Sequence, residues 1–228
     1  MRLDFLSCGL TFKIHQESLN SIKIERHRLY EEMIQDIYYT VGNVTDSVRC
    51  WTDENERYDL HKNGDTILSP FDLTYSTAEY KKKVILTLAM NLEERGYSDV
   101  LKTTYLESLQ ELEKAIVSTD YEIEYDPFIA SENFLKFLNV RLKDPEGTFI
   151  EKLCEYVKTT HSLLKKDFFF LINCAAYLRK CEYDALEEFT KTEGITILVF
   201  DTEYSCAVKP PFRDAGYRRS RDGVPQIV

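Results

Sequence analysis

Glycine-rich phosphate-binding loops are missing from this chain of 228 residues. It has eight glycines, and it contains neither GxxxxGK followed by Ser or Thr nor GxGxxG. Those loops place backbone N–H groups against nucleotide phosphates. Their absence argues against a nucleotide-dependent enzyme of the ordinary type.

Metal-binding and membrane-spanning patterns are also missing. The six cysteines and four histidines are scattered, and no CxxC pair occurs, so we expect no zinc site and reduced, mostly buried thiols. The chain contains no run of about 18 apolar residues, the length that could span a membrane. Asp4 comes too early for a signal peptide. We therefore expect a cytoplasmic protein.

Charge of one sign dominates the chain, whose net charge is -10. This disfavours a protein that grips nucleic acid with its whole surface. Basic residues can still be segregated onto one face while acidic residues gather elsewhere. Total charge therefore does not decide between nucleic-acid binding and other functions.

Two unbroken apolar runs, Phe168–Ile172 and Ile195–Phe200, flank a charged segment with a helical pattern. Continuous apolar runs indicate strands buried on both faces, as in a parallel sheet covered by helices. We predict an α/β fold with a mostly parallel sheet. Ligands of such sheets bind beyond the carboxyl ends of the strands, where Asn173 and Asp201 lie. Without a phosphate loop beside them, these two residues are predicted to cap the following turns.

Other patterns predict how the rest of the chain is organised. Alternating runs on either side of Cys8 and Gly9 predict a hairpin with a two-residue turn. Apolar residues four apart predict helices at 80–92 and 101–116, which should form an antiparallel pair and project as a leg. The predicted segments are 1–75, the first part of an α/β head; 76–166, a helical leg; and 167–228, the second part of the head.

Four carboxylates alternate after the second helix: Asp120, Glu122, Glu124 and Asp126. In an extended chain these side chains share one face, and adjacent anions repel one another unless a cation neutralises them. Calcium takes carboxylate oxygens and needs no His or Cys. Three interpretations stay open for this acidic ladder: a solvated acidic strand, a calcium site and a catalytic metal site.

Six lysines on predicted helices are the basic candidates: Lys81, Lys82, Lys83, Lys158, Lys165 and Lys166. Each lies opposite the apolar stripe of its helix. Solvated lysines on a helix surface are the ordinary interpretation, and contact with DNA phosphates is the functional one. The single tryptophan, Trp51, and His161 are predicted to be core residues.

The order of motifs from about residue 113 to residue 203 resembles the CRISPR-associated adaptation protein of type II-A systems. The resemblance rests on EIEYD at 122–126, the helix that follows up to Leu138, FFFLINCAAYL at 168–178 and ITILVFDTE at 195–203. These motifs are patterns of apolar and acidic residues, and none is a catalytic signature. The tail after Cys206 departs from the family pattern.

The resemblance implies a head like the core of P-loop NTPases, without a functional nucleotide site, and an inserted helical leg. It implies a non-enzymatic, calcium-stabilised homotetrameric ring that binds double-stranded DNA ends in CRISPR spacer acquisition, an antiviral defence. The implied partners are DNA ends, the CRISPR integrase complex and the type II effector nuclease. The acidic ladder matches the family's acidic alternating segment and would supply the calcium ligands, and the six lysines become candidate DNA contacts.

Two alternatives to this function stay open. A metal-dependent nuclease could use the acidic ladder to activate water, although no Lys or His adjoins the ladder to complete such a site. A structural adaptor for other adaptation proteins would need no contact with DNA.

Overall fold

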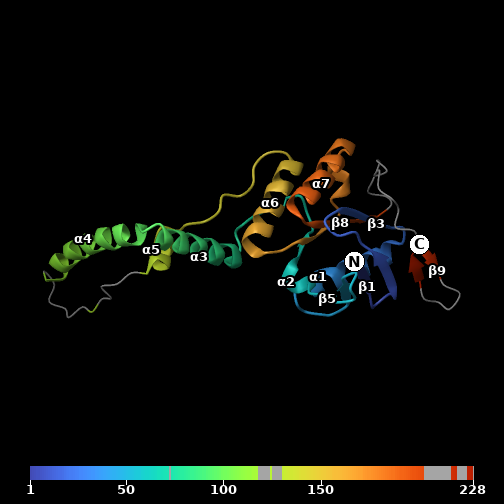
Figure 1. Ribbon diagram of the computed structural model, residues 1–228, viewed down its shortest axis with the longest axis horizontal. Helices are drawn as coiled ribbons and strands as arrows, with labels where there is room; N and C mark the ends of the chain where they lie inside the picture. Colours follow the sequence, from blue (N-terminus) through green and yellow to red (C-terminus); the bar gives the residue numbers. More distant parts are fainter. Residues whose placement is uncertain (72, 118–123, 125–129, 203–216, 220–224, 228) are drawn as a thin grey trace. The chain divides into compact units, whose positions relative to one another are not determined.

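The computed structural model describes residues 1–71, 73–117, 124, 130–202, 217–219 and 225–227 (Figure 1). The chain divides into two compact units. Unit 1 comprises Met1–Thr74 and Pro145–Val228, and unit 2 comprises Tyr75–Asp144. The helical segment predicted from the sequence runs on to residue 166. Unit 2 ends earlier because α6 (Phe149–Leu164) packs against α7 (Lys180–Glu193) in unit 1.

A four-stranded sheet, parallel throughout, forms the centre of unit 1. Its strands are β3 (Leu19–Ile24), β6 (Gly64–Ile67), β7 (Phe168–Ile172) and β8 (Thr196–Thr202), in the order β3-β8-β7-β6. β7 is buried along its whole length, and β8 is buried up to its last residue. This confirms the mixed α/β class with a parallel sheet that the two apolar runs predicted.

The two faces of this sheet have different neighbours. Phe168, Phe170 and Phe200 join one hydrophobic cluster with Met33 and Ile37 of α1 (His27–Val41). Alternate residues of a strand point to opposite faces, so the intervening residues, such as Phe169 and Val199, face the other way. Figure 1 shows α6 and α7 side by side on that opposite side of the sheet. The sheet is therefore covered on both faces.

Unit 1 also contains an antiparallel sheet. Its strands are β1 (Arg2–Phe5), β2 (Leu10–Lys13), β4 (Val48–Trp51) and β5 (Arg57–Tyr58), in the order β2-β1-β4-β5. Buried and solvent-facing residues alternate along the first three strands. The predicted hairpin is confirmed, but residues 6–9 connect its strands in place of a two-residue turn, with Gly9 at φ +65°.

The remaining described elements of unit 1 are short. They are α2 (Leu60–Asn63), the 3-10 helix η1 (Ala175–Tyr177) and the antiparallel hairpin of β9 (Tyr217–Arg219) and β10 (Pro225–Ile227). None of the helices in the described parts of the chain is long and apolar enough to cross a bilayer.

Unit 2 contains α3 (Ala78–Glu94), α4 (Tyr97–Val117) and α5 (Ser131–Phe137). Gly96 ends α3 at φ +71°, a left-handed conformation that glycine adopts without strain. The predicted antiparallel pair of α3 and α4 is wrong, because α4 leads away from the end of α3 (Figure 1). Instead α5 covers α3, and Ile85, Ala89 and Leu135 form the small core between them.

Candidate nucleic-acid interface

The carboxyl ends of β7 and β8 are the first candidate site. Asp201 is completely buried there, and its Oδ2 accepts a hydrogen bond of 2.9 Å from the N–H of Ala175 at the start of η1. Asn173, at φ +57°, accepts a bond of 2.7 Å from the hydroxyl of Tyr30 on α1. Asp201 thus binds the start of η1, which follows β7, and the turn that it was predicted to cap, after residue 202, lies outside the described residues. The side chains of Asp201 and Asn173 are thus both engaged in hydrogen bonds within the protein.

Burial keeps one thiol and one hydroxyl at this edge neutral. It raises the pKa of the Cys174 thiol to about 12, with the negative charge of Asp201 as the second cause. The pKa of the Tyr30 hydroxyl is raised by burial and then by the same carboxylate. Both groups stay protonated at neutral pH. Neither therefore supplies an anionic nucleophile or a base.

Carboxylates also occupy the N-termini of α6 and α7. Glu151 accepts a bond of 2.8 Å from the N–H of Thr148, and Glu182 accepts one of 2.6 Å from the N–H of Arg179. The bonds from Thr148 lower the pKa of the Glu151 carboxyl. Helix N-termini bind phosphates through free N–H groups and the positive end of the helix dipole. Here acidic side chains take that place, which makes these helix ends poor phosphate sites.

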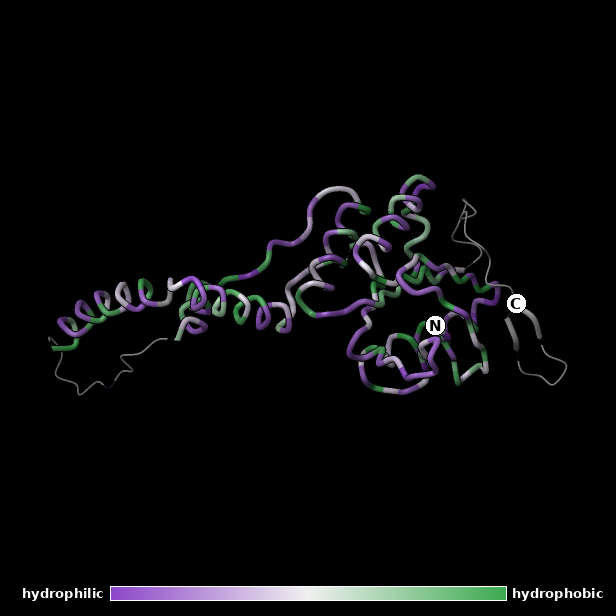
Figure 2. The backbone as a smooth tube through the Cα atoms, viewed as in Figure 1, coloured by the Kyte–Doolittle hydropathy of each residue, from purple (hydrophilic) through white to green (hydrophobic). Residues whose placement is uncertain are grey.

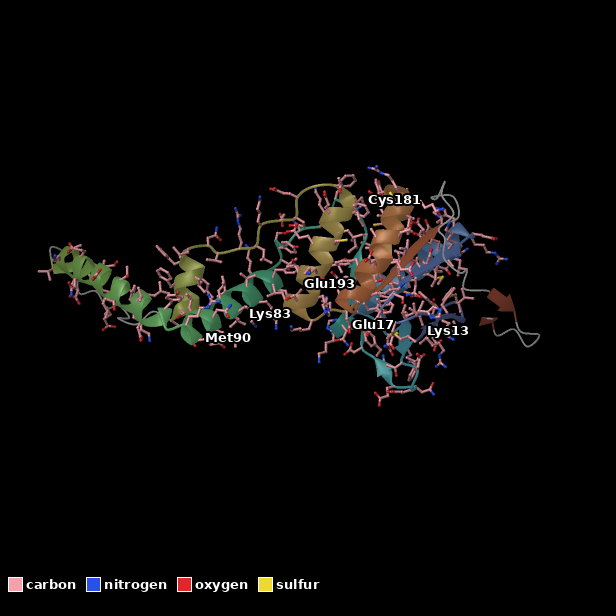
Figure 3. The ribbon with its side chains drawn as sticks, turned by 45° about the horizontal axis from the view of Figure 1, so that its top comes forward. Lys13, Glu17, Lys83, Met90, Cys181 and Glu193 are labelled. Atoms are coloured by element: carbon pink, nitrogen blue, oxygen red, sulfur yellow. The ribbon has the colours of Figure 1, made fainter. Side chains whose placement is uncertain are left out.

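Three of the candidate lysines lie in unit 2. Lys81, Lys82 and Lys83 are exposed on α3, whereas their neighbours Tyr80 and Val84 are buried. Figure 3 labels Lys83 on this helix. Successive residues of a helix are about 100° apart around its axis. The three lysines therefore spread over more than half of the circumference, and a single flat surface would meet two of them at most.

The other three candidate lysines lie in unit 1. Lys158 pairs with Glu193 at 2.6 Å on the neighbouring helix α7. Lys166 lies 4.0 Å from Asp65 of β6, with 16% of its side chain exposed. Lys165 is exposed at the left-handed residue that ends α6. A phosphate would have to compete with Glu193 for the first lysine and with Asp65 for the second.

The acidic ladder lies mostly outside the described residues. Asp120, Glu122 and Asp126 fall there, and Glu124 is described and exposed. Across the described ranges, no three or more His, Cys, Asp or Glu residues gather where they could hold a metal ion. The metal site predicted at the ladder therefore lies mostly outside the described residues and stays a prediction.

The solvent face of the antiparallel sheet carries a basic row that the sequence analysis did not single out. Strand register places Lys13, Arg2, Trp51 and Arg57 next to one another across β2, β1, β4 and β5. Trp51 was predicted to be a core residue, but it is half-buried on this outward face, and the Arg2 guanidinium lies 5.6 Å from its ring centroid. The signal was the alternation of the strands, whose outward positions repeatedly hold Arg or Lys.

These features define a mixed α/β protein in which a helical unit interrupts a sheet-containing unit. Residues 52–212 match the family model described as CRISPR-associated protein (Cas_Csn2). The chain belongs to this family, and membership implies a role in CRISPR adaptation. Strands β1 to β4 precede the matched residues. No curated protein matches the chain.

Proposed function

We propose that this chain is a non-enzymatic binder of double-stranded DNA ends that acts in CRISPR spacer acquisition. It binds independently of sequence, as a calcium-stabilised homotetrameric ring, and cooperates with the CRISPR integrase complex and the type II effector nuclease. In this proposal unit 1 is a head like the core of P-loop NTPases, and unit 2 forms the leg. Membership of the family supports the adaptation role.

The exposed apolar surface of α4 is the observation that carries the proposed assembly. Among the described side chains of this helix, Leu109 is the buried apolar one, whereas Leu106 is 50% exposed and Val100 is 62% exposed. Figure 2 shows apolar and polar positions interleaved along α4. Apolar side chains on a helix gain free energy when another surface covers them. A second copy of the chain supplies a self-complementary surface in a symmetric assembly.

The chemistry of the parallel-sheet edge supports a non-enzymatic role. The Cys174 thiol and the Tyr30 hydroxyl stay protonated, as described above. The carboxylates of Glu151 and Glu182 occupy the helix ends at which a nucleotide phosphate would bind. These features favour a DNA-binding protein over a nucleotide-dependent enzyme.

The proposed contact with DNA is to phosphates, because the sequence carries no motif that reads base edges. Each neutralised phosphate contributes about -0.9 to the slope of log affinity against log salt concentration. Fluorescence anisotropy with two unrelated duplex sequences tests this contact. We expect equal affinities for the two sequences and a steep loss of binding with salt. Affinities that differ between the two sequences and do not change with salt concentration would contradict the proposal.

Solution mass tests the ring. The chain has a mass of 26.8 kDa, and we expect a species of about four times that mass when calcium is present, since ions that bind the assembled state stabilise it. The double variant Leu106→Ser/Leu112→Ser should shift the protein to smaller species. Leu6→Ser, at an equally exposed leucine of unit 1, is the control and should leave the mass unchanged. A monomer in the presence and absence of calcium would contradict the ring.

A metal-dependent nuclease is the alternative that the acidic ladder favours, because Glu124 is exposed to solvent and clustered carboxylates can hold catalytic metals. Incubation of labelled duplex with magnesium, manganese or calcium separates the two functions. Cleavage that is lost in Glu124→Ala identifies a nuclease. Calcium-dependent binding without cleavage supports the proposed DNA-end binder.

A structural adaptor without DNA contact is the other alternative. It predicts that charge reversal at the six candidate lysines leaves the retention of duplex DNA unchanged. The proposed DNA-end binder predicts weaker retention, because each lost phosphate contact removes part of the electrostatic attraction.

A further inference from the structure

The solvent face of the antiparallel sheet orders cations in one line. Register pairs Arg2 with both Lys13 and Trp51, and it pairs Trp51 with Arg57. Residues that lie directly opposite each other on adjacent strands share a face. The intervening residues, such as Leu3, point into the hydrophobic core. The row therefore lies on the solvent side, and Figure 3 labels Lys13 on this sheet.

This face is basic in an acidic chain. Its charged members are four cations and two acids: Arg2, Lys13, Arg49, Arg57, Asp4 and Asp46. Four positive charges less two negative charges leave +2, whereas the whole chain carries -10. The nearby α-amino group of Met1 and Asp53 form an ion pair at 2.8 Å and cancel each other. This face therefore carries a net positive charge, opposite in sign to that of the whole chain.

The cations of the face remain open to solvent. The Arg2 side chain is 49% exposed while its Nε lies 3.2 Å from Asp4, and the Arg57 side chain is 54% exposed while it pairs with Asp46. Exposed ion pairs of this kind contribute little to stability, because solvent screens both charges. The guanidinium of Arg2 is also oriented by the Trp51 ring. A multivalent anion can therefore replace the acidic partners without disturbing the sheet.

We propose that this face binds the phosphate backbone of nucleic acid. The row crosses four strands, which at a spacing of about 4.8 Å corresponds to roughly 14 Å. That length matches about four nucleotides at a rise of 3.4 Å each. A protein partner would instead be expected to bind a surface with a central apolar patch. The only large apolar group among the described residues of this face is the half-buried Trp51 ring. The inference rests on the proposed DNA binding and adds a contact surface that lies mostly before the residues matched to the family.

Trp51 provides a direct probe, because it is the single tryptophan of the chain. Titration with an unlabelled duplex should change its fluorescence with saturation, and added salt should reverse the change. A parallel titration with a single strand of the same length identifies which form of the backbone occupies the face. If polyglutamate changes the emission and neither nucleic acid does, the face binds acidic protein and the inference is wrong.

The variant Lys13→Gln/Arg57→Gln removes two charges from the row. Its log–log salt slope for duplex binding should be shallower than that of the wild type by about 1.8, or 0.9 for each lost phosphate contact. The control is Arg179→Gln/Lys180→Gln at the N-terminal end of α7, which removes the same charge from exposed positions in the same unit and should keep the wild-type slope. Equal urea midpoints for the three proteins establish that folding is intact.

The outcomes separate this inference from the proposed function. The inference is wrong if the wild type binds DNA without a change in Trp51 fluorescence and Lys13→Gln/Arg57→Gln keeps the wild-type salt slope. That result does not contradict the proposed function. A Trp51 response with no preference for DNA ends supports the inference and overturns end binding. A wild-type protein that binds no nucleic acid overturns both.

Discussion

Buried polar and titratable side chains organise the carboxyl edge of the parallel sheet. Asp201 binds the backbone N–H of Ala175 and, at 3.2 Å, its neighbour Thr202. Sequence reasoning placed Asp201 at this edge because it follows an apolar run. It could not predict that Tyr30, from a distant helix, donates to Asn173, because such a contact depends on tertiary packing.

Replacement of Asp201 tests the cost of an unsatisfied N–H group. In Asp201→Ala the buried N–H of Ala175 loses its acceptor, and we expect the free energy of unfolding to fall by about 1–3 kcal/mol. Asp201→Asn keeps an oxygen acceptor and should lose less. Urea unfolding of the two variants measures the difference. Equal losses would show that the hydrogen bond to Ala175 does not stabilise this edge.

Buried thiols predict how stability depends on pH. The pKa of Cys174 is raised from 9.0 to about 12 by burial and then by the charge of Asp201. The unfolded chain therefore releases this proton at a lower pH than the folded chain does. Stability is present in full below pH 9 and is lost as the pH rises towards 12. At about pH 10 the contribution of this thiol to the loss is about 1 kcal/mol.

Urea unfolding at about pH 8 and about pH 10 measures this loss. Cys174→Ala should reduce the difference between the two pH values by about 1 kcal/mol. Cys181→Ala, at an exposed cysteine, is the comparison and should leave the difference as in the wild type. An identical difference in the two variants would contradict the role of the buried thiol.

At the scale of elements, the sequence predicted more about helices and strands than about their partners. The apolar runs identified both buried strands, β7 and β8. A strand with one face in solvent alternates apolar and polar residues, so five consecutive apolar residues indicate a strand that is buried on both faces. The pairing of α3 with α4 was wrong because both helices carry apolar residues at similar spacing. The spacing of apolar residues shows which face of a helix is buried, but it does not show which element covers that face. In the structure α5 covers the apolar face of α3.

The contact between α3 and α5 can be tested at Leu135, which is buried. Leu135→Ala should leave a cavity against Ile85 and Ala89 and destabilise the contact by about 2 kcal/mol, at the low end for core leucines. Faster amide hydrogen exchange in α3 is the expected observation. Phe137→Ala, at a side chain that is 81% exposed, should leave the exchange unchanged. Equal exchange in the two variants would contradict the packing of α5 on α3.

At the scale of the whole molecule, the distribution of charge over the surface could not be predicted from the sequence. A net charge of -10 did not reveal that Arg and Lys gather on the face of one sheet. That grouping requires knowledge of the strand register, because β1, β2, β4 and β5 are separated along the chain. The exposed apolar residues of α4 likewise become informative only when the helix is known to lack a covering helix among the described residues.

The proposed DNA-end-binding ring is tested most directly by comparing how the protein retains linear and closed circular duplex DNA. A ring that loads at free ends and holds phosphates without reading bases should bind a linear duplex and show little affinity for the same sequence as a closed circle. Cutting the circle once should restore binding, since this creates two ends and changes no sequence. Equal retention on the linear and closed circular forms would contradict a DNA-end-binding ring.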